Sequence, residues 1–476
     1  MNSPCKPFKK ILIANRGEIA VRVIRAAKEL GLETVAVYSD IDAGSLHTRI
    51  ADTKIHLGQS TAKNSYLNIE KIIAAAIQSG ADAIHPGYGF FSENADFANA
   101  VREQNLVFIG PTPEVIKLMG DKDRARKKAI EIGVPVVPGT DVNLRIEELE
   151  KFANNVGYPV LIKATAGGSG RGMRLVEREE DFQRLKGEAE AEAEAAFANK
   201  SIIVEKYVTK PRHIEIQVFA DSFGNVRHLG ERDCSVQRRH QKIVEESPAY
   251  KLHPKVKERM FEAAINLTKS VNYLGAGTLE FLVEGGEEEK SNFYFLEMNT
   301  RIQVEHTVTE EVTGIDLVKL QLKVAAGEKI PFSQKEIKFS GHALQFRIYG
   351  ENPATGFSPA TGKIIYKSPT SGIGVREDTW VENGSKISAF YDALLAKLII
   401  KGATREEAIS RAKAVLNEYI IEGFPTTLDF HRWLLQQEDY SNGCIDVKWI
   451  ERVYKGETIK STVTGPLVLH ADPQFT

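Results

Sequence analysis

Residues 295–310, FLEMNTRIQVEHTVTE, place ionisable and amide side chains at short intervals behind an apolar run. Arg301, Gln303 and Glu305 are spaced by two, so in an extended chain they project from one face, with Ile302 and Val304 facing the other way. A guanidinium can hold a small planar anion through two hydrogen bonds, and a neighbouring carboxylate can remove a proton from that anion. The alternative interpretation is a salt-bridged surface turn.

Two paired carboxylates precede this segment. GTLEFLVE and NFYFLEMN, joined by GGEEEKS, predict a β-hairpin in which Glu280 and Glu297 are at or near opposite positions. Like charges that face each other on a sheet destabilise it, so a cation between them is expected. Asn299 lies two residues further on, and this set of oxygen ligands suits Mg²⁺ or Mn²⁺. A glycosidase also uses paired carboxylates, but that alternative does not explain the nearby lysines, and a surface hairpin would point both glutamates to water.

The glycine-rich stretch LIKATAGGSGRGMRLVE lies between two β-like runs, so it predicts a hairpin tip. A P-loop needs GK[ST] at the start of a helix, and this stretch has neither feature. Glycines at a hairpin tip allow the backbone to approach a polyphosphate closely, which predicts a flexible lid. Lys163 ends the first strand, where its ammonium could neutralise phosphate charge. A buried structural lysine is the alternative.

Further polar residues come from PRHIEIQVF and ERDCSVQRRHQK, which supply His213, Gln237, His240 and Lys242. A lone histidine is more often structural than catalytic. The sequence has no HExxH and no CxxC, so histidine-based zinc chemistry is not expected.

The elements that must position these residues form several units. In the first 110 residues, five short β-rich runs alternate with helical patterns, which predicts a parallel, doubly wound sheet. NRGEIA stands where a dinucleotide-binding GxGxxG would be, and the loop HPGYGFFSEN (85–94) follows a strand end that could contact ligand. Strands dominate 201–300, a helix is expected at about 309–326, residues 327–341 form a connection, and an α+β unit follows.

Composition restricts the class of protein. The 476 residues predict two to four domains, and 42% hydrophobic and 26% charged residues are ordinary for a globular protein. A net charge of -2 offers no general attraction to nucleic acid or to a membrane surface. Cys5, Cys234 and Cys444 are dispersed, and no long apolar run is present, so a reducing, cytoplasmic location is expected.

The chain resembles the biotin carboxylases over nearly its whole length. The resemblance rests on IANRGEIAVRVIRA, HPGYGFFSEN, MGDK, IKATAGGSGRGM, ERDCSVQRRHQK, EMNTRIQVEH and YDALLAKLI, which occur in the family's order. It implies an α/β and α+β multidomain ATP-grasp enzyme, often a homodimer. The implied units are an N-terminal preATP-grasp domain at 1–119, an ATP-grasp domain at 120–330 with a mobile lid at about 136–206, and a C-terminal domain at 331–476.

The resemblance also implies a role for each matched residue. Lys122 and Lys163 would hold the phosphates of ATP beneath the loop that contains Gly167, Gly168, Gly170 and Gly172. Glu205 and the Val208 backbone would contact adenine. The ribose or phosphates would be contacted by His213, Gln237 and His240. Glu280, Glu297 and Asn299 would hold the metal, which the resemblance implies is two Mg²⁺ or Mn²⁺ ions. Lys242, Arg301, Gln303 and the Val304 backbone would bind bicarbonate, Glu305 would deprotonate it, and Arg347 would stabilise the biotin enolate.

The implied reaction is ATP-dependent carboxylation of biotin through carboxyphosphate. The sequence has no MKM-like biotinylation site, so biotin is expected on a separate carrier protein or carboxyltransferase subunit. The final carboxyl acceptor, whether pyruvate, 2-oxoglutarate or an acyl-CoA, is not encoded in these motifs.

Several positions depart from the family pattern, and two rival functions stay open. Ala166 and Ser169 replace common glycines, Gln345 stands where glutamate is usual, and Thr307 replaces a usual proline. Another ATP-grasp ligase, joining a carboxylate to an amine, would share Lys122 and Lys163 but leaves Arg347 without a role. A nucleotide-sensing subunit with a dead site would be expected to lack a metal or phosphate residue, and none is missing.

Overall fold

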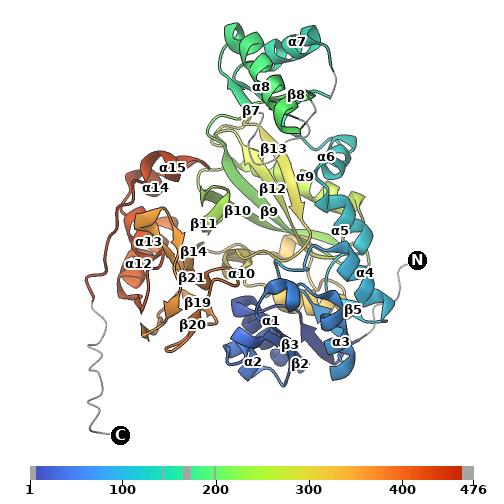
Figure 1. The fold of residues 1–476 in the computed structure, drawn as a ribbon, viewed down its shortest axis with the longest axis vertical. Helices are drawn as coiled ribbons and strands as arrows, with labels where there is room; N and C mark the ends of the chain where they lie inside the picture. Colours follow the sequence, from blue (N-terminus) through green and yellow to red (C-terminus); the bar gives the residue numbers. More distant parts are fainter. Residues whose placement is uncertain (1–6, 142–143, 165–172, 198–199, 464–476) are drawn as a thin grey trace.

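The computed structural model describes residues 7–141, 144–164, 173–197 and 200–463. Figure 1 shows an N-terminal α/β unit, a long central sheet that continues into the C-terminal strands, and a small unit that projects from one end. This combination of α/β and α+β units confirms the fold class expected from the sequence. None of the described helices is both long enough and apolar enough to cross a membrane.

The N-terminal unit is a parallel five-stranded sheet in the order β3-β2-β1-β4-β5. Its strands are β1 (Lys10–Ile13), β2 (Glu33–Ser39), β3 (Thr53–Gly58), β4 (Ala83–His85) and β5 (Val107–Phe108), and its main helices are α1 (Gly17–Glu29), α3 (Ile69–Ser79), α4 (Ala95–Glu103) and α5 (Pro113–Gly120). The doubly wound prediction is confirmed. Strand order reverses between β1 and β4, where the Asn15 amide donates to the carbonyls of Pro86 (2.8 Å) and Tyr88 (2.7 Å) and so fixes the loop after β4.

The central sheet has eight antiparallel strands in the order β13-β12-β9-β10-β11-β14-β21-β19. The strands are β9 (Arg212–Ala220), β10 (Val226–Arg238), β11 (Gln241–Ser247), β12 (Gly275–Val283), β13 (Phe293–Asn299), β14 (His342–Tyr349), β19 (Val375–Thr379) and β21 (Leu394–Gly402). Helix α9 (Pro254–Ser270) packs on β9 and β10, so even the polar strand β9 is buried along its length. The sheet carries seven of the predicted site residues, namely His213, Gln237, Lys242, Glu280, Glu297, Asn299 and Arg347.

The projecting unit contains the glycine-rich stretch. Its sheet has the order β7-β6-β8, with β6 (Val160–Ala164), β7 (Met173–Val176) and β8 (Ile202–Lys206), and it is covered by α7 (Ile146–Val156) and α8 (Phe182–Phe197). Because β6 and β7 pair as consecutive antiparallel strands, the predicted hairpin is confirmed. The tip itself, with Ala166, Gly167, Gly168, Ser169, Gly170 and Gly172, lies outside the described residues.

The single helix expected at 309–326 is wrong. The structure has two helices, α10 (His306–Thr313) and α11 (Leu317–Ala325). Gly314 adopts a left-handed conformation with φ of 69° and ends α10, and the Asp316 side chain caps α11 by accepting from the Lys319 amide. The apolar periodicity continues across this break, so periodicity alone did not reveal it.

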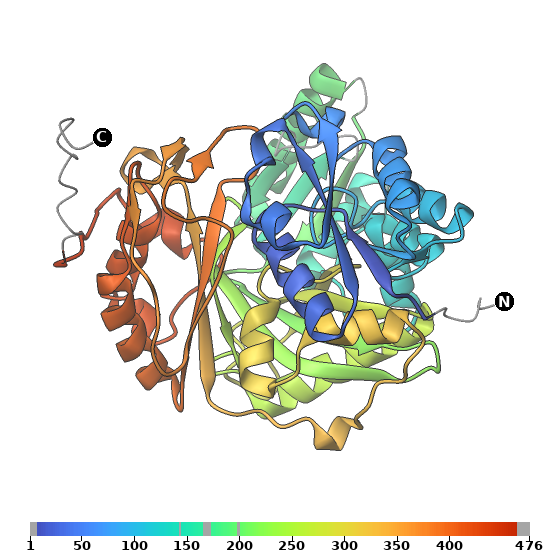
Figure 2. The same cartoon turned by 90° about the horizontal axis from the view of Figure 1, so that it is seen from below.

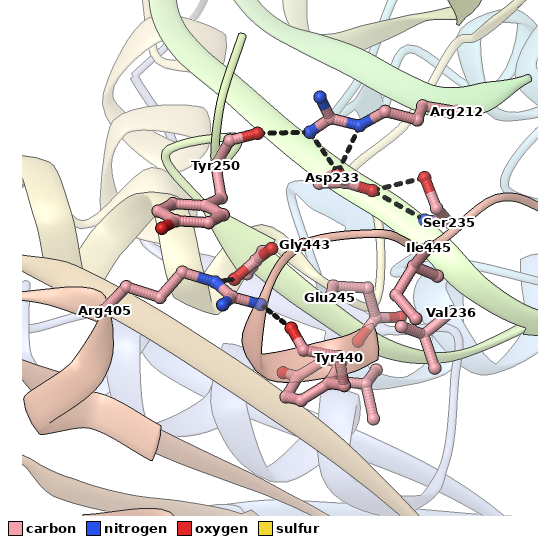
Figure 3. Close-up of a pocket in the computed structure, with 12 residues that line it drawn as sticks. Arg212, Asp233, Ser235, Val236, Glu245, Tyr250, Arg405, Tyr440, Gly443 and Ile445 are labelled. Carbon is pink, nitrogen blue, oxygen red and sulfur yellow. Dashed lines mark hydrogen bonds and ion pairs between the residues drawn. The ribbon is translucent and has the colours of Figure 1, made fainter. Parts of the chain in front are cut away.

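Helix α12 (Arg405–Glu418) packs on β14 and β21, and α1 packs on β19 and β21, so N-terminal and C-terminal helices both contact this end of the sheet (Figures 1 and 2). Arg405 at the start of α12 donates to Glu246 on β11 (2.7 Å) and to the Tyr440 carbonyl (2.9 Å). Figure 3 shows this arginine beside a small internal cavity of about 10 Å³, near the Arg212–Asp233 ion pair. These buried polar contacts join the C-terminal helices to the sheet.

Candidate active site

Three carboxylates form a row across the central sheet. Glu280 on β12 is paired in register with Glu297 on β13 and with Glu215 on β9. The predicted opposition of Glu280 and Glu297 is therefore present, and Glu215 extends it by one strand. Adjacent carboxylates repel each other, so this row requires cations.

Lys242 supplies the central cation. Its ammonium lies 2.6 Å from Glu215, 2.8 Å from Glu280 and 2.7 Å from Glu305, and its side chain is only 11% exposed. Burial alone would lower the pKa of Lys242, but the three carboxylates raise it well above its usual value. Lys242 therefore stays charged at neutral pH.

A tight turn places Lys242 beside the row. Strands β10 and β11 are joined through Arg239 and His240, which have φ of 49° and 66°. Positive φ at both central positions is the geometry of a two-residue hairpin turn that matches strand twist. In this register Gln237 is opposite Lys242, and its amide lies 3.3 Å from His213 Nδ1. His240 itself is exposed at the turn.

Both oxygens of Glu280 have polar neighbours. One oxygen accepts from Asn299 (2.9 Å) and Gln303 (2.8 Å) as well as from Lys242. The other lies 3.0 Å from His213 Nε2. Burial opposes ionisation, but Lys242 and His213 lower the pKa of Glu280 well below its usual value.

Glu305 connects the lysine to an arginine. It is the residue that precedes α10, is 2% exposed, and its second oxygen accepts from Arg347 on β14 at 2.9 Å. Burial opposes ionisation here too, but Lys242 and Arg347 lower the pKa of Glu305 well below its usual value. The expectation of an extended chain through Glu305 is wrong, because the chain turns at Val304 and Glu305 to enter the helix. Gln303 and Glu305 nevertheless reach the same cluster.

Arg347 borders a large cavity beside the cluster. Its Nε donates to Glu245 at 2.5 Å, and the guanidinium leads to a cavity of about 450 Å³ between the N-terminal unit and β14. Burial raises the pKa of Glu245 to about 7, although Arg347 acts in the opposite direction. Backbone and aromatic groups line the cavity beside the arginine, including Val304, Tyr88, Tyr349, Trp380, Phe390 and Tyr391.

Arg301 lies at a different edge of the cluster from Lys242. Its guanidinium donates to Glu93 at 2.8 Å and to the Asn299 side-chain oxygen at 2.7 Å. Glu93 belongs to the loop after β4 and also accepts from the Thr300 amide at 3.0 Å. This loop, expected to contact ligand, therefore contacts the predicted anion-binding arginine.

The residues expected at the phosphate and adenine positions lie near the projecting unit. Lys122, at the start of α6 (Lys122–Glu131), pairs with Glu297 at 3.1 Å. Lys163 pairs with Glu205 across β6 and β8, and Val208 is buried just beyond β8. The projecting unit is tied to β13 by a bridge between Val136 and Phe295. Lys122 is exposed and Lys163 is partly buried, and each has a carboxylate partner that anionic phosphate would compete with.

Sequence reasoning missed several residues of this cluster. Arg232 is fully buried and donates to Glu215 (2.5 Å), Gln303 (2.7 Å) and Thr309 (3.0 Å). Glu215 follows the singled-out His213 by two positions on the same strand face, so its spacing was an available signal. Arg232 and Glu245 gave no comparable signal, because each belongs to a different strand and they meet the cluster only through sheet pairing.

The donor set fits a hard divalent cation. Glu280, Glu297 and Asn299 offer oxygen atoms on adjacent, in-register strands, which is the chemistry that Mg²⁺ and Mn²⁺ prefer. One oxygen of Glu297 pairs with Lys122 at 3.1 Å, and the Glu297 side chain is 36% exposed. Among the described residues, His213, Glu215 and Glu280 also bring potential ligand atoms within 4.8 Å of one another, and Lys242 contacts both glutamates of that group.

The fold and this cluster define an ATP-binding ligase built from three successive units. Family models match 7–116 (biotin carboxylase, N-terminal domain), 121–333 (carbamoyl-phosphate synthase L chain, ATP binding domain) and 345–452 (biotin carboxylase C-terminal domain). Biotin carboxylase 1 of Bacillus subtilis is 49% identical over 93% of this chain and 98% of its own length. The chain belongs to the biotin carboxylase family.

Solved structures agree with this assignment. A biotin carboxylase complex with a β,γ-ATP ligand from Campylobacter jejuni has 46% identity and a TM-score of 0.83, and the alignment covers 94% of this chain and 99% of that one. The biotin carboxylase domain dimer of Hydrogenobacter thermophilus 2-oxoglutarate carboxylase, in complex with MgADP, ADP and bicarbonate, has 44% identity, a TM-score of 0.81, and coverage of 94% and 98%.

Proposed function

We propose that this protein catalyses the ATP- and bicarbonate-dependent carboxylation of biotin carried on a separate protein. The observation that carries the proposal is the continuous ionic chain Lys242–Glu305–Arg347, which runs from the carboxylate row to the cavity. Through this chain, Glu305 contacts Lys242 beside the proposed anion site and Arg347 beside the proposed biotin pocket. A ligase that joins a carboxylate to an amine leaves the link to Arg347 unexplained.

Bicarbonate would bind among Arg301, Gln303, Lys242 and the Val304 backbone. In this structure Lys242 and Arg347 are engaged with Glu305 and hold it ionised, the state that a base requires. An arriving anion would draw these two cations toward itself, which raises the proton affinity of Glu305. Anion binding and base activation are therefore coupled through the same hydrogen bonds. Bicarbonate would then attack the γ-phosphate of ATP to give carboxyphosphate and ADP.

Biotin would enter the cavity beside Arg347. The volume of about 450 Å³ suits a small ligand, and aromatic side chains with a few polar groups are typical linings of such pockets. The Arg347 guanidinium remains charged and would stabilise negative charge that develops on the ureido oxygen. Carboxyphosphate would release CO₂ and phosphate next to this pocket, phosphate would take the ureido proton, and the enolate would capture CO₂.

ATP would lie between the central sheet and the projecting unit. Lys122 and Lys163 would hold phosphates, Glu205 and Val208 the adenine, and His213, Gln237 and His240 the ribose or phosphate. Gly167, Gly168, Gly170 and Gly172 would close over the phosphates and exclude water. Glu280, Glu297 and Asn299 would hold Mg²⁺ or Mn²⁺, which supplies charge neutralisation to the phosphates when bound.

The domain limits proposed from the sequence, 1–119, 120–330 and 331–476, are supported by the family-model ranges, although the central sheet continues across the last limit. A homodimer and a biotinylated partner are supported by relatives that are subunits or domains of larger carboxylases, including a dimer. A cytoplasmic location agrees with the two free cysteines among the described residues, Cys234 and Cys444.

The experiment is ATP hydrolysis by the purified chain with and without bicarbonate and free biotin. The proposal predicts hydrolysis that requires bicarbonate and is stimulated by biotin. Hydrolysis that requires an amine and a carboxylic acid instead would identify another ligase. Nucleotide binding without turnover under any of these conditions would identify a regulatory subunit.

A further inference from the structure

Two residues that depart from the family pattern contact each other behind the arginine. The Thr307 hydroxyl is hydrogen-bonded to the side-chain oxygen of Gln345. The Gln345 amide nitrogen donates to Glu245 at 2.9 Å, and Glu245 accepts from Arg347 Nε at 2.5 Å. Thr307, Gln345 and Glu245 are all 0% exposed. Thr307 therefore reaches Arg347 through two intervening side chains.

The backbone explains this juxtaposition. Glu245 and Gln345 are directly paired between β11 and β14, and Arg347 follows Gln345 by two on the same strand, so their side chains share one face of the sheet. Thr307 lies in the first turn of α10, two residues after Glu305. The start of the helix and the arginine strand are thus joined twice, once by Glu305 and once by Thr307.

The direction of each hydrogen bond is determined by chemistry. The Gln345 amide nitrogen donates to Glu245 and its amide oxygen faces Thr307, which is the arrangement that suits the ionised form of Glu245 that Arg347 favours. That oxygen can only accept, so the Thr307 hydroxyl donates. Without this hydroxyl, the Gln345 amide oxygen would lose its hydrogen-bond donor while it stays buried.

We infer that Thr307 and Gln345 are positioning residues that orient Glu245 and, through it, the Arg347 guanidinium for the biotin half of the reaction. Apolar side chains could fill the same volume at little energetic cost, whereas a buried polar set is favourable only when every member is satisfied. Here each polar group has its partner, and the last one contacts the cavity-lining arginine. The inference rests on the proposed function, since it assigns biotin to that cavity.

The first test compares Thr307→Val with Thr307→Ser. The measured quantity is carboxybiotin formed per ADP released. Loss of one buried hydrogen bond should lower this ratio about fivefold to tenfold in Thr307→Val, since tenfold corresponds to ~1.4 kcal/mol. Thr307→Ser keeps the donor and should stay within about twofold of the parent. The ATP hydrolysis that needs only bicarbonate should change little in both.

Thr268→Val is the matched control. Thr268 is also a fully buried helical threonine, but its hydroxyl bonds only to the Ala264 carbonyl of its own helix, at 2.7 Å. The Thr268→Val variant should be less stable than the parent but should keep the parent's carboxybiotin-to-ADP ratio. A purely structural role for Thr307 would make Thr307→Val behave in the same way, which would overturn the inference.

A second variant tests whether the residues act in series. Gln345→Met removes both hydrogen bonds of Gln345, so adding Thr307→Val to it should cause no further fall in the ratio. If the two substitutions lower the ratio additively, Thr307 does not act through Gln345. If the parent protein forms no carboxybiotin at all, the proposed function fails. If the parent is active and Thr307→Val keeps its full ratio, only the positioning inference fails.

Discussion

Replacing Lys242 by methionine tests the electrostatic reasoning about the site. The substitution keeps the length and apolar stem of the side chain but removes the one ammonium that contacts Glu215, Glu280 and Glu305. Breaking a buried ion pair costs about 3–5 kcal/mol, because the remaining charge has no partner. Arg232 still contacts Glu215 and Arg347 still contacts Glu305, so the unpaired charge falls mainly on Glu280. The free energy of unfolding should therefore fall by about 3–5 kcal/mol at neutral pH.

The pH dependence of unfolding shows whether ionised carboxylates cause this loss of stability. In the parent, the pKa values of Glu280 and Glu305 are lowered, so their contribution to stability is present above their unfolded values and is lost only as pH falls. In Lys242→Met, burial without the ammonium raises the pKa of Glu280, and stability declines as pH rises through that pKa. The difference between the two proteins should consequently be larger at about pH 8 than at about pH 5.5.

Urea unfolding followed by circular dichroism measures this difference. Lys255→Met is the control, because Lys255 forms an exposed pair with Glu289 at 2.6 Å with side chains that are 60% and 53% exposed. Such a surface pair contributes about 0–1 kcal/mol, so the control should unfold almost as the parent does. A Lys242→Met protein that matches the parent at both pH values, or loses equal stability at both, would refute the account of the cluster.

Three further substitutions test separate parts of the account. Arg347→Lys should lower carboxybiotin per ADP by at least about tenfold, because lysine lacks the planar fork that reaches Glu245 and Glu305 together; equal ratios would contradict this. Arg301→Lys should raise the KM for bicarbonate about tenfold with little change in the KM for ATP, measured by hydrolysis. Burial raises the pKa of Glu18 to about 7, so Glu18→Gln should raise the melting temperature relative to the parent above about pH 7 and not near about pH 5. Thermal denaturation measures this difference, and an equal change at both pH values would exclude ionisation of Glu18 as its cause.

The N-terminal sheet and the hairpin were predictable because local patterns determine them. Alternating short apolar runs specified the five parallel strands, and the polar turn between two β-rich runs specified the opposition of Glu280 and Glu297. The break at Gly314 was missed because apolar spacing is similar on both sides of it. A left-handed glycine followed by a capping aspartate ends one helix and starts another without interrupting that spacing.

The partners of the site residues were less predictable than the residues themselves. Lys242, Glu305 and Arg347 come from β11, the start of α10 and β14, and only the register of the eight-stranded sheet brings them together. Single-sequence patterns do not specify which strands become neighbours, so the bridging role of Lys242 and the contacts of Glu245 emerged only from the structure. The departures at Thr307 and Gln345 were visible in the sequence, whereas their mutual contact was not.

The most direct test of the central claim follows the carbon of labelled bicarbonate into biotin. With ATP and Mg²⁺ present, the parent should transfer label to free biotin, and Glu305→Ala should transfer none while it binds ATP as tightly as the parent. Label transfer by Glu305→Ala at the parent rate, or none by the parent itself, would contradict the assignment of Glu305 as the base that links the anion site to the biotin pocket.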